Sequence, residues 1–418
     1  MSTNSEARGQ SAAIPPPTNV TPTVAAESLR LILSDGPVPL GYVRDEKDVY
    51  LVGRERSARW PVEVLRPGSA TVEISDERLR GAAELVVDPV ERERVLDRFR
   101  LKYGLRRYER WYSHPARVIR IRLGPSLTPS DDESRYYGWL TAEFDNVADE
   151  YDQHILGNRI NRLLRDRSLA QLRTTFGKSS RLLEIGCGSG METLPLLADG
   201  HEVFCIDISE RMLEVVRQKA RREGVTERLR TERLAAASVS RLLAECGPGE
   251  FDGAYSTYGA LNCEPDLAPI PPALHELLRP QARFVAGVYN RWCAFELLGY
   301  SLTGQFGRAF GRAGRPVRVG SSRFCVDIFA HSVPTFARTF APWFQPERVA
   351  GVPVFLPPSD LVAYAEKFPD RFDRLAGWDR VLAARWPFRL MGDHFLMTLR
   401  RAERESAGAI GSGRPHDG

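Results

Sequence analysis

A glycine loop between an apolar strand and a helix is the segment of this 418-residue chain best suited to bind a ligand. In the segment RLLEIGCGSGME, residues 181–192, Gly186, Gly188 and Gly190 alternate directly after the strand. Glycine lets the backbone turn sharply and approach a ligand without a Cβ in the way. Asp207 ends the next predicted strand, where a carboxylate can accept hydrogen bonds from two ribose hydroxyls. This combination predicts a nucleotide-like ligand.

Two further carboxylates bear on which ligand this is. Glu184 precedes the loop, and Glu192 lies in the predicted first turn of the following helix. Both would repel a pyrophosphate bound at the helix N-terminus, whereas the cationic groups of a sulfonium amino acid tolerate them. The spacing is also G-x-G-x-G and not the G-x-G-x-x-G of dinucleotide sites. The loop therefore favours S-adenosylmethionine, with a dinucleotide or a purely structural turn as the alternatives.

Transfer of a methyl group from a sulfonium is an in-line displacement, so the protein mainly has to align the acceptor and exclude water. A base is needed only if the acceptor arrives protonated. The loop STYGALN, residues 256–262, follows an apolar strand, and such sheets bind ligands at the carboxyl ends of their strands. We expect Asn262 to orient an acceptor. Tyr258 is expected either to line the acceptor pocket or to be a packing aromatic.

Two histidines are candidate bases. His275 falls on a predicted connecting helix, and His394 begins a late predicted strand. A single histidine in such a context is commonly a hydrogen-bonded structural residue, and Asp393 beside His394 equally fits a turn. His394 is the candidate that we retain for proton transfer.

An α/β sheet is needed to position these residues. Apolar strands are expected at 181–185, 202–206, 251–256 and 283–288 with helices between them, which is typical of a doubly wound parallel sheet. Aromatic residues then punctuate residues 289–345. We expect this stretch to form either an apolar cap over the acceptor or packing between helices.

The segment EIGCGSG, residues 184–190, together with Asp207 resembles the opening motifs of the class I S-adenosylmethionine-dependent methyltransferases. The resemblance covers about 136–400 and implies a Rossmann-like domain with a doubly wound, mostly parallel seven-stranded sheet. FDNVADEYD, residues 144–152, resembles the helical segment that folds over the cofactor in that family. The cofactor contacts that the resemblance implies are Glu184, Gly186, Cys187, Gly188, Gly190, Asp207, Ile208 beside the adenine, Tyr151 and Ser256.

One departure from the family pattern lies after the third strand. The family often has an acidic residue there that contacts the adenine amino group, but LAAASV, residues 234–239, contains none. Ser238 or a backbone carbonyl is the expected substitute, and a weaker hold on the cofactor would follow.

The N-terminal residues 27–123 form a separate, strand-rich domain in this interpretation. They resemble the flavin/deazaflavin split β-barrel family, which is nitroreductase-like. The basic phosphate loop of that family is missing, because LILSDGP at 31–37 runs straight on. Without the loop a flavin phosphate loses its main anchor. We therefore expect a small barrel that has lost the flavin or deazaflavin and serves for homodimerisation or acceptor docking.

Composition sets the remaining expectations. Residues 1–26 and 402–418 are expected to be disordered tails, and residues 124–134 a linker to a methyltransferase domain at 135–401. The N-terminal residues lack the apolar core of a secretory signal, and no long apolar run is present, so a cytoplasmic protein without membrane contact is expected. The six cysteines lack metal-site spacing and are expected to be reduced thiols, with no metal bound.

Four functions remain open from the sequence. The leading one is methylation of a small molecule, and the second is a bifunctional protein with flavin or deazaflavin redox chemistry in the first domain. The third is an RNA methyltransferase, because the Arg and aromatic run at 100–122 has the mixture that stacking and phosphate contacts need. The net charge of only +4 argues against nucleic acid. The fourth is a non-catalytic cofactor-binding scaffold.

Overall fold

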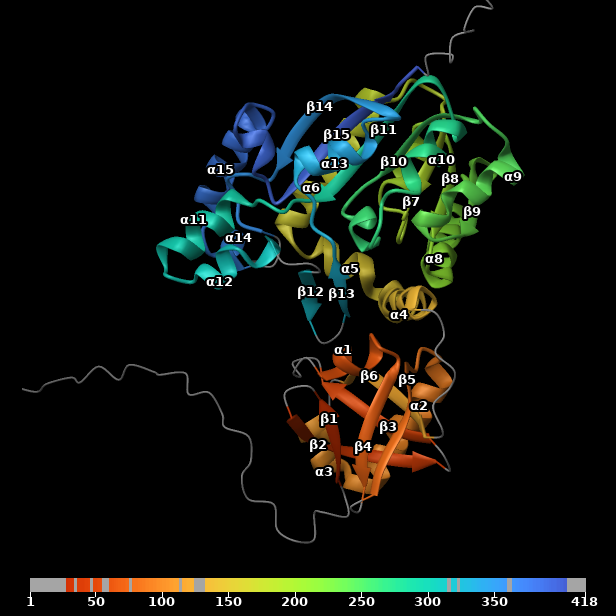
Figure 1. Ribbon diagram of the computed structural model, residues 1–418, viewed down its shortest axis with the longest axis vertical. Coiled ribbons are helices and arrows are strands. Elements are labelled where there is room, and N and C mark those ends of the chain that lie inside the picture. Colours follow the sequence, from red (N-terminus) through yellow and green to blue (C-terminus); the bar gives the residue numbers. More distant parts are fainter. Residues whose placement is uncertain are drawn as a thin grey trace, which may run out of the picture. The chain divides into compact units, whose positions relative to one another are not determined.

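The chain divides into two compact units, Met1–Arg135 and Tyr136–Gly418 (Figure 1). The computed structural model describes residues 28–33, 36–45, 48–54, 60–74, 77–112, 115–123, 132–313, 317–321, 324–358 and 363–403. The tail expected at 1–26 lies outside the described residues, as do residues 404–418 and 124–131 of the expected second tail and linker.

The first unit is a closed barrel. Its strands are β1 (Ser28–Leu33), β2 (Gly36–Asp45), β3 (Asp48–Arg54), β4 (Ser69–Ile74), β5 (Glu77–Leu85) and β6 (Pro115–Leu123), in the order β1-β2-β3-β6-β5-β4. Alternate residues fill its interior, such as Leu51 on β3 and Ile119 and Ile121 on β6, as the period of a strand requires. The helices are α1 (Trp60–Leu65), α2 (Pro89–Tyr103) and α3 (Leu105–Tyr112). The structure confirms that the first domain is a small barrel. Membership of the split β-barrel family stays a prediction from the resemblance.

The hairpin between β1 and β2 bears on the expected loss of the loop that binds a flavin phosphate. Leu33 pairs directly with Gly36, so only two residues connect the strands. A connection of that length has no room for a basic loop around a phosphate, which agrees with the gap in the sequence motif.

The second unit contains a seven-stranded mixed sheet in the order β14-β15-β11-β10-β7-β8-β9. The strands are β7 (Arg181–Ile185), β8 (Glu202–Asp207), β9 (Leu229–Arg233), β10 (Phe251–Ser256), β11 (Leu278–Tyr289), β14 (Phe344–Val352) and β15 (His394–Arg401). β15 runs antiparallel to both of its neighbours, β11 and β14, and the remaining pairs are parallel. The four strands expected from the sequence are all present, and the expected Rossmann-like sheet is confirmed.

Helices cover both faces of this sheet (Figure 1). The residues of β7 alternate between two cores: Leu183 and Ile185 pack on one face, and Leu182 packs on the other. The first core includes α9 (Leu242–Cys246), α10 (Ile270–Leu277) and α13 (Val333–Phe340), and the second includes α6 (Arg159–Thr175), α7 (Thr193–Ala198) and α8 (Glu210–Glu223). Central strands that are buried on both faces explain the continuous apolar runs in the sequence.

Three further groups of elements complete the second unit. Before the sheet come α4 (Asp132–Val147), a short turn and α5 (Tyr151–Leu156). After β11 comes an insertion with α11 (Ala294–Leu302), α12 (Phe306–Ala309), the turn Gly311–Ala313 and the hairpin β12 (Val317–Ser321) and β13 (Phe324–Ile328). The elements α14 (Ala363–Lys367) and α15 (Pro369–Leu382) precede β15. Among the described residues, no helix has the length and apolar character that crossing a bilayer requires.

Candidate active site

The glycine loop turns at the carboxyl end of β7 and is anchored to the next strand. The amides of Gly186 and Cys187 donate to the Ile206 carbonyl at 2.8 and 3.3 Å. Gly186 has a φ of +73°, and a Cβ at this position would lie 2.4 Å from the Cβ of Ala260. A Cβ on Gly190 would lie 2.8 Å from Leu194. Close packing on both sides therefore requires glycine here, while Gly186 and Gly188 keep part of their backbone exposed.

Asp207 is held against this loop. One carboxylate oxygen accepts from the Gly188 amide at 2.8 Å and the other from the Ser209 amide at 2.9 Å. Only 7% of the residue is exposed, and this burial raises the pKa of Asp207 to about 6. The carboxylate thus lies between the exposed glycine backbone and the N-terminus of α8, where Ser209 caps the helix as expected.

Glu184 supports the loop from inside the protein. Its Oε2 accepts from the Thr193 hydroxyl at 2.5 Å, the Tyr255 hydroxyl at 2.9 Å and the Cys205 thiol at 3.4 Å. Burial raises the pKa of Glu184 to about 7. Glu184 is therefore bonded to side chains of the protein core. The sequence interpretation, in contrast, placed its charge beside the ligand.

Glu192 is likewise not the uncompensated charge that the sequence suggested. It is a buried residue whose Oε2 forms an ion pair with Arg165 of α6. Arg165 also lies over the Tyr258 ring, with 4.0 Å between the guanidinium carbon and the ring centroid. The argument that two carboxylates repel a pyrophosphate is therefore wrong, and the glycine spacing alone disfavours a dinucleotide.

Several buried polar atoms around the loop have no hydrogen-bond partner among the described residues. They include a donor, Nε of Arg165, and two acceptors, Oε1 of Glu192 and Oδ1 of Asn161. Orphaned buried polar atoms are costly, so each requires an explanation such as a bound group, a water or a functional role. The Arg165–Glu192 pair places a donor beside an acceptor, which fits the carboxylate and ammonium groups of an amino acid. Tyr151 is adjacent, because its ring would lie 4.0 Å from a Cβ on Gly188.

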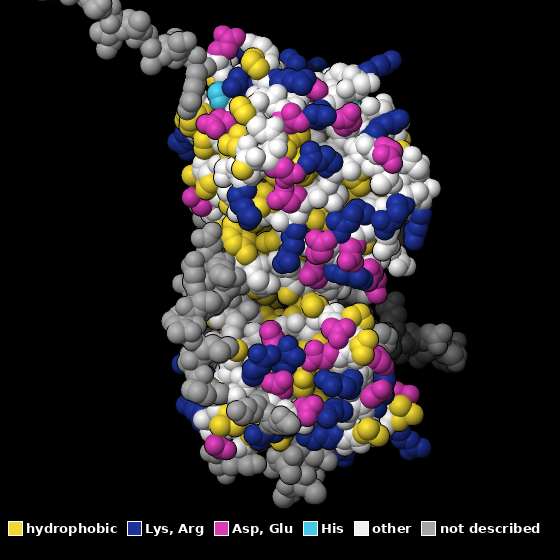
Figure 2. Space-filling view, turned by 90° about the vertical axis from the view of Figure 1, so that its right-hand side faces the viewer, with side chains coloured by type: hydrophobic (Ala, Val, Ile, Leu, Met, Phe, Trp, Pro, Cys, Tyr) yellow, Lys and Arg dark blue, Asp and Glu magenta, His cyan; other side chains and the backbone are white. Residues whose placement is uncertain are grey.

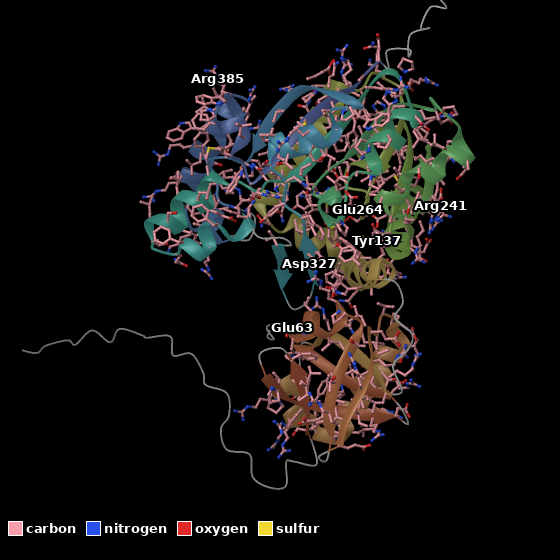
Figure 3. All side chains as sticks on the ribbon, in the orientation of Figure 1. Glu63, Tyr137, Arg241, Glu264, Asp327 and Arg385 are labelled. Atoms are coloured by element: carbon pink, nitrogen blue, oxygen red, sulfur yellow. The ribbon has the colours of Figure 1, made fainter. Side chains whose placement is uncertain are left out.

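A carboxylate lies against the stretch 234–239, in which the sequence contains no acid. Glu264, which follows the loop after β10, accepts from the Ala237 amide at 3.1 Å and from the Tyr137 hydroxyl at 2.5 Å. Tyr137 of α4 and Glu264 are labelled together in Figure 3. Ile208 and Ser238 are half-buried in the same region. The third strand lacks an acid, but the fold supplies one from a different loop.

The rings of His394 and Tyr258 stack on each other, and Tyr258 belongs to the loop that follows β10. Their ring centroids are 5.9 Å apart with an angle of 18° between the planes, and Tyr289 meets His394 edge-on at 5.2 Å. His394 Nδ1 lies 3.1 Å from the Asp393 carboxylate. A Cβ on Gly259 would be 3.9 Å from His394 Nε2. His394 therefore lies beside the loop that follows β10, at the carboxyl edge of the sheet.

Asn262 does not have the role expected from the sequence. It is fully buried, its amide nitrogen donates to the carbonyls of Tyr289 and Phe329 at 3.2 and 2.8 Å, and its oxygen accepts from the Tyr289 amide at 2.8 Å. These bonds occupy both donor hydrogens, so Asn262 ties the turn Ala260–Cys263 to β11 and to the residue that follows β13, and it has no donor left to orient an acceptor. Ser256 is also fully buried, at the end of β10. His275 contacts the Ala402 carbonyl at 2.9 Å, which fits a structural histidine.

One described group has the geometry of a metal site. Ligand atoms of Cys293, Glu296 and Asp393 lie within 4.8 Å of one another. Arg312, however, already donates to both carboxylates. A cation is thus supplied by the chain itself, and the group does not fit a metal ion.

Sequence inspection missed Arg165, Glu264 and Arg312. Arg165 had only a weak local signal, since it is a charged residue directly beside the buried Leu164 on α6. Glu264 and Arg312 had none, because each acts on a partner brought close only by the fold.

Residues 182–281 match the family model described as "Methyltransferase domain", about a quarter of the chain. The chain is 31% identical over 119 residues to a ubiquinone biosynthesis O-methyltransferase from Xylella fastidiosa, covering 28% of this chain and 46% of that protein. It is 27% identical over 104 residues to a tRNA 5-carboxymethoxyuridine methyltransferase from Escherichia coli K12, covering 23% and 39%. The chain therefore spans less than half the length of these two curated relatives.

Among solved structures, the chain resembles a 1,6-didemethyltoxoflavin-N1-methyltransferase from Burkholderia thailandensis with bound 1,6-didemethyltoxoflavin and S-adenosylhomocysteine. The identity is 20% and the TM-score 0.41, over 68% of this chain and 96% of that one. The strand order and the helices on both faces, not this likeness, define the fold.

Proposed function

We propose that the methyltransferase domain of this chain transfers the methyl group of S-adenosylmethionine to a small-molecule acceptor. One observation carries the proposal: Asp207 is held beside partly exposed glycine backbone at the carboxyl edge of the sheet, within the matched residues 182–281. This edge is where open α/β sheets bind their ligands.

The residues around the loop fit this cofactor. Asp207 would accept from the ribose hydroxyls, the backbone at 186–188 would follow the ligand closely, and Ile208 with Ser238 and Glu264 would flank the adenine. The unpartnered atoms of Arg165, Glu192 and Asn161 would bind the amino-acid end. When bound, the cofactor supplies a methyl group that its sulfonium already activates.

On the acceptor side, Tyr258 and Tyr289 offer flat apolar walls beside His394. His394 can accept a proton from an acceptor hydroxyl or amine, because its other nitrogen is oriented by Asp393. Tyr258 is half-buried and is held by the cation of Arg165, so its place beside the loop is supported.

A small molecule is favoured over RNA by the state of the Arg and aromatic run at 100–122. Tyr103, Tyr108 and Tyr112 pack into the first unit's own core and offer no face for base stacking. Arg120 pairs with Glu84 and Glu91 inside that unit. On the face shown in Figure 2, basic and acidic side chains are interspersed and not gathered by sign. Neither the run at 100–122 nor the face in Figure 2 therefore forms the continuous basic surface that nucleic-acid binding requires.

The test is calorimetric titration of S-adenosylmethionine and S-adenosylhomocysteine into the full chain. We expect a Kd in the micromolar range, weakened about tenfold or more by Asp207→Asn. Asp252→Asn is the matched control, because Asp252 lies at the opposite end of the same sheet and pairs with Arg279. Absence of binding to the wild type, or equal effects of both substitutions, contradicts the proposal.

A further inference from the structure

Arg312 is a buried cation that no step above uses. It follows α12 in the insertion after β11, is 3% exposed and lies over the Tyr289 ring at 4.0 Å. Its Nε and Nη2 donate to the two oxygens of Glu296 at 2.7 and 2.6 Å. Its Nη1 donates to the carbonyls of Asn290 and Asp393 at 3.1 and 2.9 Å. A guanidinium with this many fixed partners holds a single orientation.

The same guanidinium holds the Asp393 carboxylate. Arg312 Nη2 donates to Asp393 Oδ1 at 2.5 Å, and Asp393 Oδ2 faces His394 Nδ1 at 3.1 Å. A carboxylate that accepts from Nδ1 keeps the proton of a neutral imidazole on that nitrogen. Nε2, on the side of Gly259, is then the nitrogen that can accept a proton.

Arg312 is also what allows Asp393 to remain ionised. Burial by itself raises the pKa of Asp393, but the charge of Arg312 outweighs burial, together with hydrogen bonds from Arg312 and His394, and holds the pKa of Asp393 below its usual range. Without Arg312, the carboxylates of Asp393 and Glu296 would be buried within 4.8 Å of each other. Two such groups cannot both stay ionised, and a protonated Asp393 no longer selects the histidine tautomer.

We propose that Arg312 is a positioning residue that sets the tautomer of His394 through Asp393, so that the insertion after β11 prepares the base for an acceptor with an ionisable hydroxyl. The role as a base rests on the proposed function. In such a transfer the acceptor O–H bond breaks as the O–CH₃ bond forms, the electrons of the S–CH₃ bond return to sulfur, and the proton passes to His394 Nε2.

The experiment reads the tautomer directly, without an acceptor. Full-length protein labelled with ¹⁵N-histidine is examined by two-bond ¹H–¹⁵N correlation at alkaline pH, and His394→Gln assigns the signals. We expect the wild type to carry its proton on Nδ1. The variant Arg312→Met removes the cation and leaves the carboxylates of Asp393 and Glu296 uncompensated, so that Asp393 takes up a proton. We expect its two nitrogens to move toward averaged shifts.

Arg308→Met is the matched control, because Arg308 is an exposed arginine on α12, one turn away. It should leave the tautomer unchanged. Thermal unfolding shows whether Arg312→Met is folded. If it is not, Arg312→Lys, which retains the charge, replaces it and should shift the nitrogens in the same direction but less.

Two results would overturn the proposal: a wild-type His394 protonated on Nε2, or a folded Arg312 variant with wild-type shifts. Calorimetry with S-adenosylmethionine on the same samples separates this outcome from failure of the proposed function. Loss of cofactor binding in the wild type with an intact tautomer pattern would refute only the methyltransferase activity.

Discussion

Two buried acids, Glu184 and Asp207, support the glycine loop from opposite sides. Both have a raised pKa, about 7 for Glu184 and about 6 for Asp207, and burial is the main cause in each. They differ in their partners: Glu184 accepts side-chain donors within the core, while Asp207 accepts the loop amide of Gly188. A neutral isostere should therefore be tolerated at Glu184 and harmful to ligand binding at Asp207.

The pH dependence of stability tests the state of Glu184. Its pKa is 4.5 as a reference and about 7 when folded, so between these values the folded state binds more protons than the unfolded state. The free energy of unfolding then falls as pH rises through this window, by on the order of 3 kcal/mol for a full shift. Glu184→Gln has no proton to lose. We expect its melting temperature to rise relative to wild type between pH 5 and pH 8.

Glu202→Gln is the control for this series, because Glu202 lies on the neighbouring strand β8 with an exposed side chain paired to Arg181. Its difference from wild type should stay constant over the same pH range. A constant difference for Glu184→Gln as well would mean that Glu184 is ionised throughout.

At the scale of elements, the turn from β7 into α7 depends on close contact with the loop after β10. Gly186 has a positive φ, and a Cβ added to this residue would lie 2.4 Å from the Cβ of Ala260. Gly186→Ala should therefore displace the loop and weaken cofactor binding by about tenfold or more, with about 1–2 kcal/mol of backbone strain in addition. Calorimetry and thermal unfolding measure the two effects.

The double variant Gly186→Ala with Ala260→Gly separates these causes. It removes the steric contact and keeps the strain, so binding should recover in part while stability does not fully return. Gly138→Ala on α4, where an added Cβ meets nothing within 4 Å, should be slightly stabilising. If the double variant binds no better than Gly186→Ala, the contact with Ala260 is not what the glycine avoids.

At the scale of the whole molecule, the second unit has its own sheet, two cores and all the residues assigned to the cofactor. We expect a fragment of residues 132–403 to fold and to bind S-adenosylmethionine within about threefold of the full chain, since a contiguous core suffices for an independent domain. Calorimetry on both proteins checks this. A folded fragment with much weaker binding would show that the barrel contributes to the site, and would revive acceptor or cofactor docking as its role.

Features that depend on residues close together in the sequence could be predicted. The strand, glycine turn and capped helix around Gly186 and Ser209 depend on short-range backbone preferences, and the alternating helices and strands follow from apolar periodicity. Asp207 could be identified because it ends the strand next to the loop. The barrel strands could likewise be predicted from local patterns. The closure of the barrel could not, because it pairs β1 with β4, two segments that no local pattern joins.

The charges around the site were decided by the tertiary structure. Glu192 is neutralised by Arg165, 27 residues away, and Asp393 is held by Arg312, 81 residues away, while Asn262 is consumed by backbone groups of two other segments. Sequence periodicity says which side chains are buried, but the protonation and role of a buried polar group depend on which partners meet it. The sequence by itself therefore determined the sheet and the glycine loop, and only the folded chain decided which partners the buried carboxylates and His394 meet.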